Sequence, residues 1–278
     1  MYEKILVPLD GSKVAEVALS SAEDLARRMG AQIVLFSVAE STEAQDYHKH
    51  EIYLSKIADD IRQREQDQPE VFPEKVVSID SIVQVGHAAD EIIRYSNEEN
   101  VSLIVMATHG RSGIKRLTLG RMVDRVLRAT RQPLLLIRAG TTRDGNGNMS
   151  VLHKAIVALD GSEESESVIP HIEKLAARLQ TEVILLQVVA HSYRVYADAE
   201  AYLETVLHLF KSKGINVNSV VRMGNAATEI IKLTNETKAD IVAMSTHGRS
   251  GIRQWTIGSV ADRILRRGKS YVLLVRSR

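Results

Sequence analysis

The chain alternates between short apolar runs and longer segments in which apolar residues recur every three or four positions. Such runs predict buried strands, and the amphipathic segments predict helices. Within the first 138 residues, the expected strands are 4–9, 33–38, 76–85, 102–107 and 134–137, and the expected helices lie at 14–28, within 45–66, at 88–100 and at 120–129. This order predicts a parallel sheet covered by helices on both faces. Because crossovers between parallel strands are right-handed, we expect a doubly wound α/β sandwich with five strands.

The same pattern occurs twice. Residues 81–138 align without gaps on 219–276, with 27 identities in 58 positions. The starts of the halves match at an offset of 150 instead of 138, so the first half holds 12 extra residues between Val38 and Gly86. A repeat of about 140 residues is a duplicated domain, because solenoid repeats are only about 20–50 residues long. We therefore expect one domain over 1–140 and a second over 152–278, joined by a Gly-, Asn- and Thr-rich linker at about 139–151.

Composition and charge exclude several functions. The chain has 36 basic and 35 acidic residues, so its net charge is +1, which argues against a nucleic-acid or membrane partner. It contains no Cys, which excludes disulfides and thiolate metal sites. The N-terminal segment does not resemble a signal peptide, and no apolar run approaches the roughly 18 residues of a membrane span. We expect a cytoplasmic protein.

The residues after the expected strands carry the candidate chemistry. In the second half a loop at 245–251 follows the fourth strand, and Gly258-Ser259 opens the next helix. Glycines allow close approach to a ligand, and a helix N-terminus favours an anion, so the loop is either a phosphate cradle or a simple turn. Asp10 and Asp160 end the first strands. Each can accept a ribose hydroxyl, although an N-cap or Asx-turn explains a single Asp-Gly equally simply.

These residues resemble the universal stress protein family, over nearly the whole chain and twice. The family's adenine-nucleotide loop, Gly-x2-Gly-x9-Gly-Ser/Thr, corresponds to Ser245-x2-Gly248-x9-Gly258-Ser259 in the second half. In the first half it corresponds to Ala107-x2-Gly110-x9-Gly120-Arg121. The resemblance implies two Rossmann-like (HUP-like) domains that bind ATP or AMP in a stress-response regulatory role. Any Mg²⁺ would arrive with nucleotide phosphates, and we expect no other metal.

The resemblance also implies a set of nucleotide-binding residues. The aspartates would hold the ribose, the valines and methionines would line the base and ribose, and the glycines and Ser259 would contact phosphates. In the first half these residues are Pro8, Asp10, Val38, Met106, Gly110, Arg111, Gly113, Gly120 and Arg121; in the second half they are Asp160, Val188, Met244, Ser245, His247, Gly248, Arg249, Gly251, Gly258, Ser259 and Val260. Because Arg121 replaces the small hydroxyl residue, the second half is the expected better site. Arg121 either fills the phosphate space or binds a phosphate itself.

Alternative functions remain open on the sequence. A slow ATP hydrolase would need a base, but neither His109 nor His247 has an identifiable nucleophile or orienting partner, so we expect no catalytic residues. His48 and His50 are expected to be solvated. A scaffold without nucleotide is the third possibility. Since single-domain relatives dimerise through their last strand, the resemblance implies that the two domains form an intramolecular pseudo-dimer, with a further homodimer left open.

Overall fold

The computed structural model describes residues 2–67, 78–108, 120–138, 152–190, 193–248 and 257–277. The chain divides into two compact units. The described residues up to Arg138 form unit 1, and those from Leu152 onward form unit 2. Each unit is an α/β fold, as the alternating pattern predicts. No helix in these described ranges is long and apolar enough to cross a membrane.

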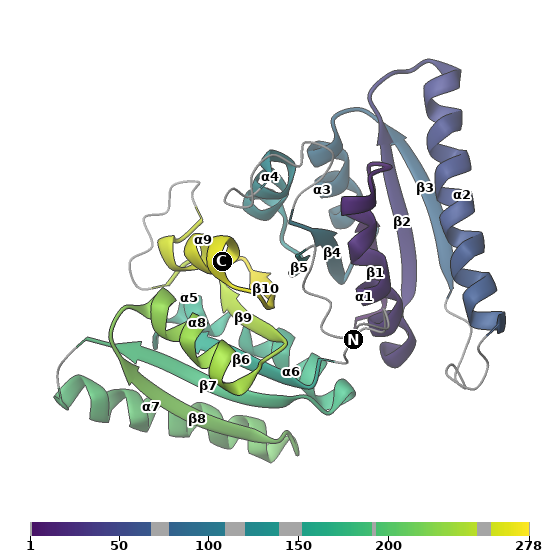
Figure 1. Cartoon of the computed structure of the whole chain (residues 1–278). Coiled ribbons are helices and arrows are strands. Elements are labelled where there is room, and N and C mark those ends of the chain that lie inside the picture. The colour runs from purple at the N-terminus through teal and green to yellow at the C-terminus, as the bar shows by residue number, and fades with distance from the viewer. Residues whose placement is uncertain are drawn as a thin grey trace. The chain divides into compact units, whose positions relative to one another are not determined.

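Unit 1 alternates strands and helices in the predicted order (Figure 1). Its elements are β1 (Lys4–Pro8), α1 (Lys13–Met29), β2 (Gln32–Ala39), α2 (Ala44–Asp67), β3 (Ile79–Val85), α3 (Ala88–Glu98), β4 (Leu103–Ala107), α4 (Arg121–Ala129) and β5 (Leu134–Ile137). The strands lie in the order β3-β2-β1-β4-β5, and every neighbouring pair is parallel. All residues of β4 and β5 are buried, because helices cover both faces of a parallel sheet.

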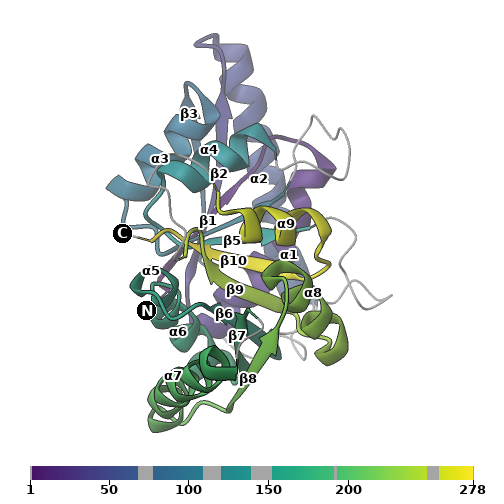
Figure 2. The same cartoon turned by 90° about the vertical axis from the view of Figure 1, so that its left-hand side faces the viewer.

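Unit 2 repeats this arrangement. Its elements are β6 (Lys154–Leu159), α5 (Glu163–Glu166), α6 (Ile169–Leu179), β7 (Glu182–Val189), α7 (Tyr193–Ser212), β8 (Val217–Met223), α8 (Ala226–Thr237), β9 (Ile241–Ser245), α9 (Ser259–Arg267) and β10 (Tyr271–Val275). Figure 2 shows β10, β9, β6, β7 and β8 following one another across this unit. All neighbouring strands are again parallel.

The two units differ in their first helix. In unit 1, α1 runs for 17 residues without interruption, from its N-cap Ser12 to Gly30, which ends it in the left-handed conformation. In unit 2 the corresponding segment is two helices, α5 and α6, with Pro170 in the first turn of α6. Proline has no N–H group, and its ring clashes with the carbonyl four residues earlier, here Glu166. The expectation of one continuous helix in this segment is therefore wrong.

The extra residues of the first half can be assigned to two places. Leu54 and Ile61 of α2 correspond to Leu203 and Phe210 of α7 at an offset of 149, and all four side chains are fully buried. One of the 12 extra residues (150 − 149) therefore precedes α2. The other 11 (149 − 138) fall between Ile61 and β3. The expected strand residues 76 and 77 and the expected linker lie outside the described residues.

The strand order places the switch point of each unit between its first and fourth strands. In unit 2, β6 lies between β7 and β9, and the chain proceeds in opposite directions on either side of it. In doubly wound sheets, ligands bind beyond the carboxyl ends of the strands at such a point. Asp160 follows β6 and Thr246 follows β9, so the candidate residues lie at this edge.

Candidate functional site

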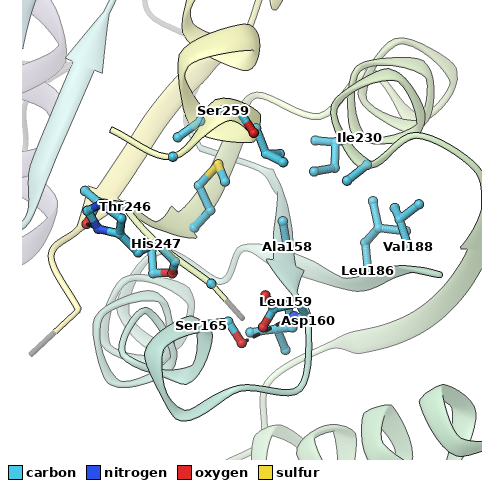
Figure 3. Close-up of a pocket in the computed structure, with 17 residues that line it drawn as sticks. Ala158, Leu159, Asp160, Ser165, Leu186, Val188, Ile230, Thr246, His247 and Ser259 are labelled. Carbon is cyan, nitrogen blue, oxygen red and sulfur yellow. Dashed lines mark hydrogen bonds between the residues drawn. The ribbon is translucent and has the colours of Figure 1, made fainter. Parts of the chain in front are cut away.

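A pocket opens at the switch point of unit 2. Its volume is about 140 Å³, and residues that are far apart in the sequence line it. Figure 3 shows Asp160 and Ser165 on one side of the pocket, Ser259 and Ile230 opposite, and Leu186 and Val188 on a third side. The full lining is Ala158, Leu159, Asp160, Ser165, Leu186, Val188, Ala226, Ile230, Met244, Ser245, Thr246, His247, Gly248, Gly258, Ser259, Val260 and Ala261. We call this cavity the unit 2 pocket.

A local hydrogen-bond network fixes the Asp160 carboxylate. Its Oδ1 accepts hydrogen bonds from the backbone N–H of Ser162 at 3.0 Å and from the Ser162 hydroxyl at 2.5 Å. Ser162 is the N-cap of α5, and its Oγ accepts from the N–H of Ser165. The Asx-turn and the cap are therefore both present. They leave Oδ2 directed toward Gly248, so the turn orients the carboxylate instead of replacing a binding role.

Gly248 lies in close contact with this carboxylate. A Cβ atom added at Gly248 would be 2.1 Å from Oδ2 of Asp160 and 3.0 Å from its Cγ. A side chain at this position fits only if the Asp160 carboxylate moves away. The glycine is therefore favoured by the close approach of the loop to Asp160, which brings the nucleotide loop and the aspartate at the end of β6 to one place.

Gly258 places the N-terminus of α9 at the pocket. Its N–H donates to the carbonyl of Thr246 at 3.0 Å, and an added Cβ would be 2.8 Å from that same oxygen. Gly258 is the N-cap of α9, so the cap residue has no side chain to bond the N–H groups of the first turn. Ser259, Val260 and Ala261 of that turn line the pocket. Unpaired N–H groups and the positive end of the helix dipole make this end a favourable place for an anion.

The wall between these polar ends is apolar. Leu186 and Val188 alternate along β7 and therefore face the same side of the sheet. Ile230 of α8 and Met244 of β9 complete this wall. A flat apolar ligand group can pack here, while a sugar and a phosphate can meet Asp160 and the start of α9.

The loop residues after β9 are held by contacts among themselves. The hydroxyl of Ser245 donates to the carbonyl of His247. Oγ1 of Thr246 lies 3.1 Å from Nδ1 of His247. Ser245 and Thr246 are buried, whereas His247 is half-buried at the pocket edge. These contacts fix the direction in which the loop leaves the sheet.

The pocket gathers every implied nucleotide-binding residue of the second half that lies in the described part. These nine are Asp160, Val188, Met244, Ser245, His247, Gly248, Gly258, Ser259 and Val260. Arg249 and Gly251 lie outside the described residues. The other eight lining residues are not among those that the sequence implied: Ala158, Leu159, Ser165, Leu186, Ala226, Ile230, Thr246 and Ala261. Only the i, i+4 spacing of Ala226 and Ile230 gave a sign of a shared helix face.

Unit 1 has the same aspartate geometry. Oδ1 of Asp10 accepts from the N–H of Ser12 at 3.0 Å and from its hydroxyl at 2.5 Å. Gly120 donates to the carbonyl of Thr108 at 3.2 Å, as Gly258 does to Thr246. Arg121 is exposed at the first position of α4.

The other implied residues of unit 1 are placed as follows. Pro8 and Met106 are buried, and Val38 is half-buried near the end of β2. Gly110, Arg111, Gly113 and His109 lie outside the described residues. Among the described residues of the chain, no group of three or more His, Asp or Glu side chains could hold a metal ion.

One histidine outside the pocket differs from expectation. His48 is exposed, as expected. His50 is not simply solvated, because its Nδ1 lies 2.7 Å from Oγ of the buried Ser37. The Ser37 hydroxyl donates to the carbonyl of Leu9, so Nδ1 of His50 must be the donor in the second contact.

Comparison with known proteins agrees with this architecture. The model of the universal stress protein family matches residues 1–138 and 152–276. Universal stress protein MJ0577 of Methanocaldococcus jannaschii is 22% identical over 155 residues, covering 50% of this chain and 96% of that protein. YxiE of Bacillus subtilis is 28% identical over 148 residues, covering 50% and 100%. The crystal structure of a universal stress protein from Archaeoglobus fulgidus has 20% identity and a TM-score of 0.75, covers 99% of each chain and has the same fold.

Proposed function

Because the chain belongs to the universal stress protein family in both of its units, we propose that it is a regulatory protein of the stress response and that unit 2 binds an adenine nucleotide, ATP or AMP. The observation that carries the proposal is the pocket at the switch point. There the Asp160 carboxylate, the glycine against it and the uncapped start of α9 meet in one cavity.

Each part of a nucleotide has a chemical counterpart in the unit 2 pocket. The ribose hydroxyls donate to Asp160, whose rotamer is already fixed by Ser162. The phosphate accepts from the N–H groups of the first turn of α9 and from the Ser259 hydroxyl. The base packs against the apolar wall that includes Val188 and Ile230. In this arrangement the ribose lies at the end of β6, the phosphate lies at the start of α9, and the base lies against the apolar wall.

Native mass spectrometry of the full chain tests the proposal. We expect one adenine nucleotide per chain, either co-purified or after addition of AMP or ATP. Calorimetry with AMP and ATP then gives the affinity of each. A chain that binds neither nucleotide at millimolar concentration would be a scaffold without nucleotide, and the proposal would be withdrawn.

Asp160→Ala tests the position of the sugar. We expect the affinity for AMP and for adenosine to fall by similar factors, about 10- to 150-fold, because both lose the same charge-assisted hydrogen bonds. Calorimetry with the two ligands measures these factors. Asp10→Ala, the equivalent change in unit 1, is the matched control and should leave the affinity unchanged. If only AMP weakened, the carboxylate would act near the phosphate and the pose would be wrong.

A further inference from the structure

One hydroxyl in the unit 2 pocket has no role in the nucleotide contacts described so far. Ser165 lies on α5, is 3% exposed and lines the pocket beside Asp160 (Figure 3). In unit 1 the equivalent residue, at an offset of 150, is Ala15, which is also buried. The hydroxyl is therefore not needed to form the turn between the first strand and the first helix.

The hydrogen bonds of Ser165 leave one acceptor position open. Its hydroxyl donates to the carbonyl of Ser162 at 2.8 Å. Its Oγ accepts from the backbone N–H of Asp160 at 3.3 Å. A serine hydroxyl has one proton and two lone pairs. One lone pair therefore remains, next to the carboxylate that would hold the sugar.

The neighbouring phenol of Tyr202 is a possible competitor for this lone pair. Its hydroxyl is buried, and the side chains of Glu166 and Ser165 lie beside it. Burial and the Glu166 carboxylate raise the pKa of the phenol, so it keeps its proton and needs an acceptor. A carboxylate is a stronger acceptor than a hydroxyl.

Unit 1 shows which acceptor such a tyrosine uses. Tyr53 of α2 corresponds to Tyr202 of α7 at the offset of 149 that aligns these helices. The Tyr53 hydroxyl donates to Oε1 of Glu16 at 3.2 Å, and Glu16 corresponds to Glu166. By analogy with unit 1, we infer that the Tyr202 hydroxyl donates to Glu166, which leaves the lone pair of Ser165 available to a ligand.

We propose that Ser165 determines the sugar specificity of the unit 2 pocket, its Oγ accepting a hydrogen bond from a ribose hydroxyl of the nucleotide whose sugar Asp160 holds. Unit 2 then favours ribonucleotides over nucleotides that lack this hydroxyl. The inference rests on the proposed function, because it assumes that a nucleotide occupies the pocket. It assigns no such preference to unit 1, where Ala15 has no acceptor.

The test compares three ligands on two proteins. AMP, 2′-deoxy-AMP and 3′-deoxy-AMP are titrated by calorimetry into the wild-type chain and into Ser165→Ala. We expect Ser165→Ala to weaken AMP binding about 2- to 12-fold, the range for one neutral hydrogen bond. The affinity for one of the two deoxy nucleotides should stay the same, because that ligand lacks the hydroxyl that bonds Ser165. The analogue that responds less identifies the hydroxyl.

Two further variants separate specificity from structure. Ser167→Ala removes a hydroxyl that bonds only the carbonyl of Glu164 outside the pocket, and it should change none of the three affinities. Tyr202→Phe removes the competing donor and should leave the preference for AMP over the deoxy nucleotides intact. Equal weakening of all three ligands by Ser165→Ala, no weakening at all, or loss of the preference in Tyr202→Phe would overturn the inference while leaving nucleotide binding standing. Failure of the wild-type chain to bind AMP would overturn both.

Discussion

The two units share a backbone frame but fill it differently at the switch point. In unit 2, Ala158 and Leu186 are register partners on β6 and β7, and both line the pocket. In unit 1 the same register pair is Pro8 and Phe36. Phe36 is fully buried, and its ring lies 4.9 Å from that of Tyr95 on α3. Larger side chains therefore occupy the positions that form the cavity in unit 2.

The first turn of the last helix also carries larger side chains in unit 1 than in unit 2. Arg121, Met122 and Val123 of α4 stand where α9 has Ser259, Val260 and Ala261. A cation at a helix N-terminus is also unfavourable toward the helix dipole. Asp124 in the same turn pairs with Arg128 through both carboxylate oxygens. From this comparison we propose that the aspartate turn, which both units have, is not enough to make a site, and that the space between the walls decides.

The largest expected effect is that of Gly248→Ala. The new Cβ would lie 2.1 Å from Oδ2 of Asp160, so the carboxylate must rotate away from the sugar. We expect the affinity for the nucleotide to fall about 150-fold, the upper end of the range for losing a charge-assisted hydrogen bond. Calorimetry measures the affinity, and the thermal unfolding midpoint of the free chain serves as the control. Retained affinity would show that the contact between Gly248 and Asp160 does not define the site.

Exchanging the residues at the start of the two helices sharpens the comparison. Ser259→Arg removes a hydroxyl and crowds the phosphate, and we expect about 10- to 150-fold weaker AMP binding. The reciprocal Arg121→Ser should leave the affinity of unit 2 unchanged. The two variants are compared by calorimetry on the full chain. Unchanged affinity in Ser259→Arg would count against the phosphate position.

Filling the pocket from β7 tests the role of the space. Leu186→Phe copies Phe36 of unit 1, and we expect about fivefold weaker AMP binding, from roughly 1 kcal/mol of overpacking against the ligand. Phe36→Leu is the matched change in unit 1 and should alter the unfolding midpoint without altering AMP affinity. If Leu186→Phe bound AMP as the wild type does, the width of this wall would not explain the difference between the units.

Separating the units tests the pseudo-dimer that the family implies. We expect residues 1–140 and 152–278, expressed alone, either to homodimerise or to unfold at a lower temperature than in the whole chain. Each kcal/mol lost from the free energy of unfolding lowers the midpoint by roughly 2–8 °C. Sedimentation and thermal unfolding measure the two outcomes. Two monomeric fragments as stable as the whole chain would remove the pseudo-dimer from consideration.

The sequence predicted most of the fold because its strands are buried on both faces. The run LIVMA of β4 has no polar position, so its strand character is clear without any tertiary information. The break before α6 was missed because the repeat implied one helix, although Pro170 forbids its continuation. His50 was also misread, since its polar neighbours along the chain conceal the buried Ser37 contact.

The polar half of the site was predictable, and the apolar half was not. Asp160 follows the first strand of its unit, and Gly248 and Gly258 have the spacing of the loop that the family shares. Ile230 comes from a helix with no distinguishing pattern, and only the crossover brings it to the pocket. Ser165 was missed because a serine in the first turn of a helix carries no sign of a ligand contact.

The register pairs Pro8–Phe36 and Ala158–Leu186 also have a consequence for the free energy of unfolding of each unit. In unit 1, Pro8 and Phe36 occupy their positions permanently, so that packing is independent of solution composition. In unit 2, Ala158 and Leu186 line the pocket, and a nucleotide that bound there as proposed, and only to the folded state, would stabilise that state by mass action. At a concentration one hundred times its dissociation constant, this contribution is about 2.7 kcal/mol. Under the proposed function, the folded population of unit 2 would therefore rise with the nucleotide concentration, whereas the packing of Pro8 against Phe36 in unit 1 needs no ligand.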